Sequence, residues 1–200
     1  MFAPGRRKAL LFLGSIGMPQ FALGDTAESG ERDVVIAYVN SLVELAGSAS
    51  KDLVVASMTT SFVVHHQGIP TLAELRGDIP ETTGLTAQEF LRVNASPMKL
   101  DMPVEVLAHW THVRMVDEET LTQLFEQPNP AGGWKQFYSE YPNACALIQF
   151  SRVGIDDQAR QALFSVSISS GMLRGASYLV LMQNRDGAWR QFRDKMVGIS

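Results

Sequence analysis

Cysteine, basic charge and long apolar runs are all scarce in this chain of 200 residues. A single cysteine, Cys145, cannot form an intramolecular disulfide framework. No apolar run reaches the roughly 18 residues that a membrane-spanning helix needs, so the sequence predicts no stable membrane span. The 17 Lys and Arg residues are outnumbered by 21 Asp and Glu residues, and the formal net charge of −4 argues against a nucleic-acid partner.

The first 24 residues have the pattern of a secretory signal. Three basic residues at positions 6–8 precede an apolar stretch over 9–18, and the small-residue pattern Ala22-Leu23-Gly24 follows. A basic start, a short apolar middle and small residues two apart are typical of a signal peptide. We therefore predict export to the periplasm or the medium, with cleavage after Gly24. The paired arginines leave twin-arginine export open beside the general route.

Cleavage would leave a single domain over residues 25–200. The signal contains three of the 17 basic residues and no acidic residue, so the mature chain has 14 basic and 21 acidic residues and a formal charge of −7. The whole chain is 46% hydrophobic and 19% charged, which is the composition of a folded domain and not of a disordered chain. A mature chain of about 176 residues is long enough to bury roughly 70% of its unfolded surface.

Helical and extended patterns alternate in the first two-thirds of the mature chain. Ser29 can cap a helix whose apolar residues recur at helical spacing. Thr86 and Glu89 have the spacing of a capping box, and Asp117 can cap a further helix. Glycine and proline interrupt residues 67–84, which predicts mostly loop. The predicted elements are helices over 29–46, 86–94 and 118–126, a short helix that contains Trp134, Phe137 and Tyr138, and extended segments over 53–64 and 104–116.

From Cys145 onward the pattern is that of β-strands. Apolar residues alternate with other residues over 146–150 and again over 162–169. The serines of the second stretch predict one polar, solvated face, and they are Ser165, Ser167 and Ser169. The sequence Asn184-Arg185-Asp186-Gly187 predicts a tight turn before the last strand.

Short strands that follow one another through tight turns predict an antiparallel meander at the C-terminus. Because helical patterns precede these strands, we expect an α+β fold with an N-terminal helix and short helices packed on an antiparallel sheet. The alternative is a cystatin-like or transport-factor-like cone, a resemblance of fold alone that the meander and the Gly187-x-Trp189 ending suggest.

The last third of the chain contains several short motifs in order. They are Trp134-x-x-Phe137-Tyr138, Ser151-Arg152-Val153-Gly154, Gln161-Ala162-Leu163, Gly171-x-Leu173-x-Gly175-x-x-Tyr178 and Gly187-x-Trp189. This set resembles a group of uncharacterised secreted bacterial proteins, and the resemblance implies a mostly β C-terminal region and no established activity. The chain departs from the group at Ile155 and Gly198, where aromatic residues are common. It also departs at Ser170 and Arg174, where some members have cysteines.

The histidines and serines form no recognisable catalytic or metal-binding motif. His65 and His66 are adjacent and His109 and His112 lie three apart, and in extended chain both spacings place the side chains on opposite faces. The sequence contains neither the zinc-protease spacing nor the nucleophile elbow of α/β-hydrolases. We therefore predict no catalytic residue, no metal site and no cofactor.

Four residues are the candidate binding residues: Arg152, Trp134, Tyr138 and Tyr178. Arg152 follows an apolar strand, and its guanidinium can bind a carboxylate ligand or pair with Asp156 or Asp157. Trp134 and Tyr138 either anchor their helix to the sheet or form the aromatic wall of a pocket. Tyr178 belongs to the glycine-bearing motif described above.

Together these observations predict an exported, non-catalytic domain that binds an unidentified protein or small molecule. The serine face and the turn at Arg152 are its expected surface. The alternative is a small periplasmic enzyme with a pocket between the N-terminal helix and the sheet. A cavity where His109 or His112 meets Arg152 or Asp156 would favour the enzyme, and a flat exposed patch would favour the binding domain.

Overall fold

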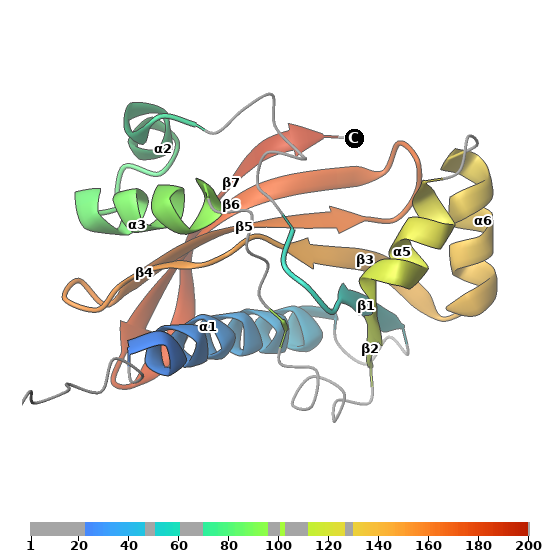
Figure 1. Ribbon diagram of the computed structural model, residues 1–200, viewed down its shortest axis with the longest axis horizontal. Coiled ribbons are helices and arrows are strands. Elements are labelled where there is room, and N and C mark those ends of the chain that lie inside the picture. Colours follow the sequence, from blue (N-terminus) through green and yellow to red (C-terminus); the bar gives the residue numbers. More distant parts are fainter. Residues whose placement is uncertain are drawn as a thin grey trace, which may run out of the picture.

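Seven strands of the described chain form one mixed sheet with helices on both faces (Figure 1). The computed structural model describes residues 23–46, 51–60, 70–95, 101–102, 112–126 and 130–199. The strand order is β2-β1-β3-β5-β6-β7, and β4 pairs with β5 off this path. The strands are β1 (Asp52–Ala56), β2 (Val113–Val116), β3 (Ala144–Phe150), β4 (Gly154–Asp156), β5 (Gln161–Ser169), β6 (Gly175–Arg185) and β7 (Ala188–Ile199). Within the described ranges, no helix is long and apolar enough to cross a membrane.

The C-terminal meander is confirmed. Strands β5, β6 and β7 pair antiparallel in chain order. Asp186 and Gly187 connect the last two strands with φ angles of 54° and 84°. Positive φ at both central residues is the geometry of a two-residue hairpin turn, and Asp-Gly is a preferred sequence for it. This part of the α+β prediction therefore follows from local sequence.

The other end of the sheet is parallel, although the sequence predicted antiparallel pairing throughout. β1 pairs parallel with β2 on one side and with β3 on the other. Helices lie between these strands along the chain, and parallel neighbours need such a crossover because the chain must return to the edge where the first strand began. The extended prediction over 53–64 shortens, since β1 ends at Ala56. The prediction over 104–116 contains β2 from Val113 onward, and residues 61–69 and 103–111 lie outside the description.

The first helix, α1 (Leu23–Ala46), lies across one face of the sheet (Figure 1). Its buried Tyr38 contacts Phe150 of β3 and Phe164 of β5 edge-on, with ring centroids 6.0 and 5.2 Å apart. Burial raises the pKa of Tyr38 far above the ordinary value, so its hydroxyl stays protonated. The predicted cap at Ser29 is wrong because α1 begins at Leu23, and the exposed Ser29 lies inside the helix.

Two helix pairs cover the opposite face at its two ends (Figure 1). α2 (Leu72–Asp78) and α3 (Gly84–Ala95) pack over Leu163 of β5. α5 (Glu118–Phe125) and α6 (Pro130–Glu140) pack over Leu147 of β3. Leu147 pairs directly with Ser169, so these two side chains lie on the same face of the sheet. Ser169 and Leu163 of β5 also share that face, because alternate residues of a strand point the same way. Both helix pairs therefore lie opposite α1.

One further predicted helix start needs correction, one is confirmed, and one helix was not predicted. Within the stretch 67–84, where the sequence predicted mostly loop, Thr71 and Glu74 form a capping box that begins the 7-residue helix α2. The box predicted at Thr86 and Glu89 is absent: α3 begins two residues earlier, and the hydroxyl of Thr83 accepts from the Thr86 N–H at 3.1 Å. Asp117 caps α5 as predicted, accepting from the Thr120 N–H at 2.7 Å.

The serine face of β5 is buried, so the prediction of a solvated face is wrong. Ser165 and Ser167 are 7% and 8% exposed. The hydroxyl of Ser151 accepts a hydrogen bond of 2.9 Å from the Ser165 N–H, which places the chain after β3 beside this strand. Only Ser169, at the end of the strand, remains half-exposed. The alternation of serines and apolar residues correctly predicted which side chains share a face. It did not predict that other segments of the chain cover that face.

Candidate functional site

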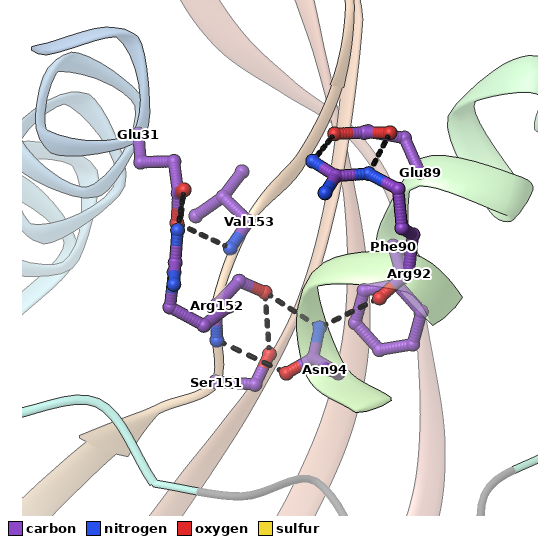
Figure 2. A network of polar contacts seen from close by, with 8 residues as sticks. All are labelled: Glu31, Glu89, Phe90, Arg92, Asn94, Ser151, Arg152 and Val153. Atoms are coloured by element: carbon purple, nitrogen blue, oxygen red, sulfur yellow. Dashed lines mark hydrogen bonds and ion pairs between the residues drawn. The ribbon is translucent and has the colours of Figure 1, made fainter. Parts of the chain in front are cut away.

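Arg152 lies in the interior and pairs with Glu31 of α1 (Figure 2). The two side chains are 9% and 5% exposed. The Arg152 Nε donates to Glu31 Oε2 at 2.9 Å and Nη2 donates to Oε1 at 2.5 Å. The Val153 N–H also donates to Glu31 Oε2, at 3.0 Å. A carboxylate that accepts these three bonds compensates the buried guanidinium, as a buried charge requires.

Asn94 of α3 fixes the same segment from the other side (Figure 2). Its side-chain oxygen accepts from the Arg152 N–H at 3.1 Å, and its side-chain nitrogen donates to the carbonyl oxygens of Arg152 at 3.0 Å and Phe90 at 2.9 Å. Gly154 lies against the same helix, where an added Cβ would be 2.1 Å from the Phe90 nitrogen. We call Glu31, Asn94, Ser151, Arg152 and Val153 the Arg152 network.

The predicted pairing of Arg152 with Asp156 or Asp157 is therefore wrong. Asp156 accepts from the Thr83 hydroxyl at 2.9 Å and from the Gln158 and Ala159 N–H groups at 3.0 Å. Arg152 instead reaches a carboxylate 121 residues away in the sequence. Since its guanidinium is bonded inside the protein, we place the candidate binding site elsewhere.

A groove of about 440 Å³ opens beside α5 and α6, and we call it the α5–α6 groove. It lies where β1 ends and beside the last residues of its parallel neighbour β3. Open sheets with parallel strands bind ligands at this carboxyl edge. The groove is lined by Ala56, Ser57, Met58, Thr59, Thr60, Glu118, Leu121, Thr122, Phe125, Glu126, Trp134, Leu147, Gln149 and Ser169.

One wall of the groove is the chain that leaves β1, and backbone hydrogen bonds hold it in place. The Ser57 N–H donates to the carbonyl of Val116 at 2.8 Å, and the Ser57 carbonyl accepts from Met102 at 2.7 Å. The Thr60 N–H donates to the carbonyl of Phe150 at 2.7 Å. Ser57, Thr59 and Thr60 therefore line the groove on a fixed backbone; Thr59 is buried, and the Thr60 hydroxyl donates to the Phe150 carbonyl at 3.3 Å.

Another part of the lining is aromatic. Trp134 and Phe125 both line the groove, and their ring centroids are 5.0 Å apart with 59° between the planes. Tyr138 lies next to Trp134, at 6.0 Å between ring centroids, and its hydroxyl donates to the carbonyl of Ser170 at 2.9 Å. Burial raises the pKa of Tyr138, which keeps this donor protonated. Both readings of the aromatic motif therefore apply, since Trp134 lines a groove while Tyr138 anchors its helix.

The four predicted binding residues do not meet at one site. Trp134 lines the groove, and Tyr138 supports it. Tyr178 packs on the other face of the sheet, against the cluster that contains Tyr38 of α1. Arg152 lies in its own buried network. Sequence reasoning missed the hydroxyl residues Ser57 and Thr60, although polar residues placed directly after a buried strand were a signal for them.

The groove is acidic. Glu118 and Glu126 line it at the two ends of α5, and its lining includes no Lys, Arg or His from the described chain. Asp117 stands beside Glu118 and caps the helix, and the hydrogen bond from the Thr120 N–H lowers the pKa of its carboxyl. The groove thus combines carboxylates, hydroxyl groups and aromatic rings, which together can hold a small molecule with polar and apolar parts.

A second hollow, of about 800 Å³, lies between α1 and the hairpin of β6 and β7. Asp33 and Glu44 of α1 line it, together with Trp189 and Arg190 of β7. This is the place that the sequence suggested for an enzyme pocket. The two carboxylates are 11 residues apart on one helix, about 16 Å along its axis, which is too far for them to act as an acid–base pair.

The histidines do not meet Arg152 or Asp156 in the described residues. His112 Nδ1 lies 3.5 Å from Asp52 Oδ1 at the edge of the sheet, while His65, His66 and His109 lie outside the description. Three or more His, Cys, Asp or Glu side chains that could hold a metal ion are nowhere grouped in the described ranges. Comparisons with protein families, with curated proteins and with solved structures find no match to this chain.

Proposed function

We propose that this protein is an exported, non-catalytic domain that binds a small molecule in the α5–α6 groove. The observation that supports the proposal is the groove itself, which Ser57, Thr60, Trp134 and Phe125 line together at the carboxyl edge of parallel strands. Its volume of about 440 Å³ is within the range of pockets that bind small molecules. A concave site replaces the flat patch expected from the sequence.

Export remains a proposal based on the signal pattern of residues 1–24 and on the resemblance to secreted bacterial proteins. The fold is compatible with cleavage after Gly24, because that cut removes only the first two residues of α1. Glu31, which pairs with Arg152, stays in the mature chain. Mass spectrometry of the exported protein should find an N-terminus near Asp25, and a mature protein that retains Met1 would contradict the proposal.

Fragment screening by NMR tests the binding site. We would titrate the ¹⁵N-labelled protein with a library that contains neutral, cationic and anionic fragments, and we expect the shifted amide signals to cluster at Ser57, Thr60, Phe125 and Trp134. Thr122→Trp places a large side chain in the groove from an exposed position of α5. This variant should weaken the binding of groove fragments by about tenfold or more, because it fills the space that they occupy.

Gln123→Trp is the matched control, since Gln123 is the next exposed residue of α5 and does not line the groove. It should bind the fragments like the unmodified protein. The proposal fails if no fragment binds in the groove or if Thr122→Trp and Gln123→Trp bind equally well. It also fails if the shifts cluster instead around Trp189, in the hollow beside α1, which would favour the alternative site there.

A further inference from the structure

We infer that the α5–α6 groove selects an organic cation, a substituted ammonium group on a short chain that has a hydroxyl group. The inference rests on the proposed function and names the ligand class of the same groove. It is supported by the charge of α5, by the aromatic residues of the groove and by the hydroxyl and amide residues in the rest of its lining.

The charge of α5 favours a cation. Residues 117–126 include four carboxylates, those of Asp117, Glu118, Glu119 and Glu126, and no basic residue. Asp117, Glu118 and Glu119 stand at the helix N-terminus, where the helix dipole stabilises negative charge. Glu126 is different, because it is the C-cap residue at the negative end of the dipole and the last turn has no basic residue. A cation bound in the groove would offset this unfavourable charge.

The aromatic wall favours the same ligand. Cations bind over the faces of aromatic rings within about 6 Å of the centroid, and Trp is the best ring for this interaction. Trp134 and Phe125 both line the groove, with their ring centroids 5.0 Å apart and 59° between the ring planes. Glu126 follows Phe125 in the sequence and lines the same groove. A substituted ammonium group bound in the groove would therefore lie among aromatic rings and a carboxylate.

The rest of the lining accounts for the polar end of the ligand. Ser57, Thr59 and Thr60 line the groove from the chain that leaves β1, and Gln149 and Ser169 line it from the ends of β3 and β5. Hydroxyl and amide groups can donate to a ligand hydroxyl or accept from it. Nothing in this arrangement favours an anion, because the charged side chains of the described lining are Glu118 and Glu126.

Choline and its neutral carbon isostere, in which a quaternary carbon replaces the nitrogen, test the inference because they share one shape and differ in charge. NMR titration at low ionic strength should show choline bound in the groove, with signals of Phe125 and Trp134 shifted. The isostere should bind about tenfold more weakly or worse, since it keeps the apolar contact and loses the charge. Added salt should weaken the binding of choline more than that of the isostere.

Matched charge variants separate local charge from net charge. Glu118→Gln with Glu126→Gln should weaken choline binding by about tenfold and leave binding of the isostere unchanged. Glu119→Gln with Glu140→Gln removes the same total charge from exposed positions of α5 and α6 outside the lining, and should bind choline normally. Trp134→Phe keeps a ring and should bind choline better than Trp134→Leu, once the thermal unfolding of both variants shows that they are folded.

The inference is overturned if choline shows no saturable binding up to about 50 mM, well above the millimolar range of weak ligands. It is also overturned if the isostere binds as tightly as choline or if the two double variants behave alike. Neutral or anionic fragments that bind in the groove while choline does not would leave the proposed function standing. No fragment binding of any charge would remove both.

Discussion

The Arg152 network and the α5–α6 groove use polar side chains in opposite ways. In the network, Arg152 and Asn94 make their bonds to Glu31 and to the backbone inside the protein, and the segment is fixed between α1 and α3. In the groove, hydroxyl groups and carboxylates line an open space of about 440 Å³. The buried charge of Arg152 is thus bonded within the protein, whereas the carboxylates of Glu118 and Glu126 in the groove are exposed.

The strongest test of this comparison is Glu31→Gln. The change removes the partner charge of a buried guanidinium, and breaking a buried ion pair typically costs about 3–5 kcal/mol. Urea denaturation should show a loss of this size in the free energy of unfolding. Fragments should still bind in the groove at temperatures where the variant is folded, since Glu31 does not line it.

Glu89→Gln is the control for Glu31→Gln, because Glu89 pairs with Arg92 at the surface. The hydrogen bond from Arg92 lowers the pKa of the Glu89 carboxyl, but solvent screens an exposed pair, and such pairs are worth about 0–1 kcal/mol. The replacement Glu31→Leu with Arg152→Met should recover part of the lost stability by removing both charges. Equal losses in Glu31→Gln and Glu89→Gln would contradict the role given to the network.

A smaller loss is expected for Gly154→Ala. The added Cβ would lie 2.1 Å from the Phe90 nitrogen, so the backbone of α3 or of β4 must move. Overpacking of this kind costs about 1–3 kcal/mol, which thermal or urea unfolding measures. Gly77→Ala in α2 is the matched control, because no atom lies within 4 Å of its added Cβ. It should keep or raise stability, as Ala is the better helix former, and a similar loss in both variants would refute the close packing.

The smallest effect is expected beside the groove, for Asp117→Asn. The Thr120 N–H lowers the pKa of the Asp117 carboxyl, so its charge stabilises the fold above the ordinary carboxyl pKa of about 4. This contribution is lost as the pH falls through the lowered pKa. Melting temperatures measured from neutral to acidic pH should fall less steeply for Asp117→Asn than for the unmodified protein.

Asn can still cap α5 at neutral pH, whereas Asp117→Ala loses the capping hydrogen bond as well. The alanine variant should therefore melt below the asparagine variant at pH 7. If the acid-side slopes of Asp117→Asn and the unmodified protein coincide, the charge of Asp117 makes no contribution to the cap.

Local sequence predicted the elements whose causes lie within a few residues. Asp117 was recognised as a cap, and Asp186-Gly187 as a hairpin turn, because each depends on its own backbone geometry. The start of α2 was predictable in the same way, from Thr71 and Glu74, but the surrounding glycine and proline residues favoured loop. Near the start of α3 lie two threonines three residues apart. The capping-box pattern predicted Thr86 as the cap, but the Thr83 hydroxyl accepts from the Thr86 N–H.

The candidate site was less predictable, because its walls come from distant parts of the chain. The motif of Trp134 left open whether it anchors its helix or lines a pocket, and the other lining residues Ser57 and Gln149 come from the ends of β1 and β3. The parallel pairing of β1 with β2 and β3 brings these ends together, and alternation of apolar residues carries no information on strand direction. Arg152 was predicted to bind a ligand or to pair with Asp156 or Asp157, whereas its guanidinium pairs with Glu31 of α1.

The amino-acid sequence by itself determined the α+β class, the C-terminal meander and the acidic balance of this protein, because periodicity, turn residues and charge are local properties. Only the tertiary structure decided that Glu31 neutralises Arg152 across 121 residues, that Ser165 and Ser167 of β5 are covered and that Trp134 lines one groove with the chain leaving β1. Which residues meet depends on how the strands pair and which helix covers which face. Long-range packing of the whole chain fixes that choice, and no short stretch of residues encodes it.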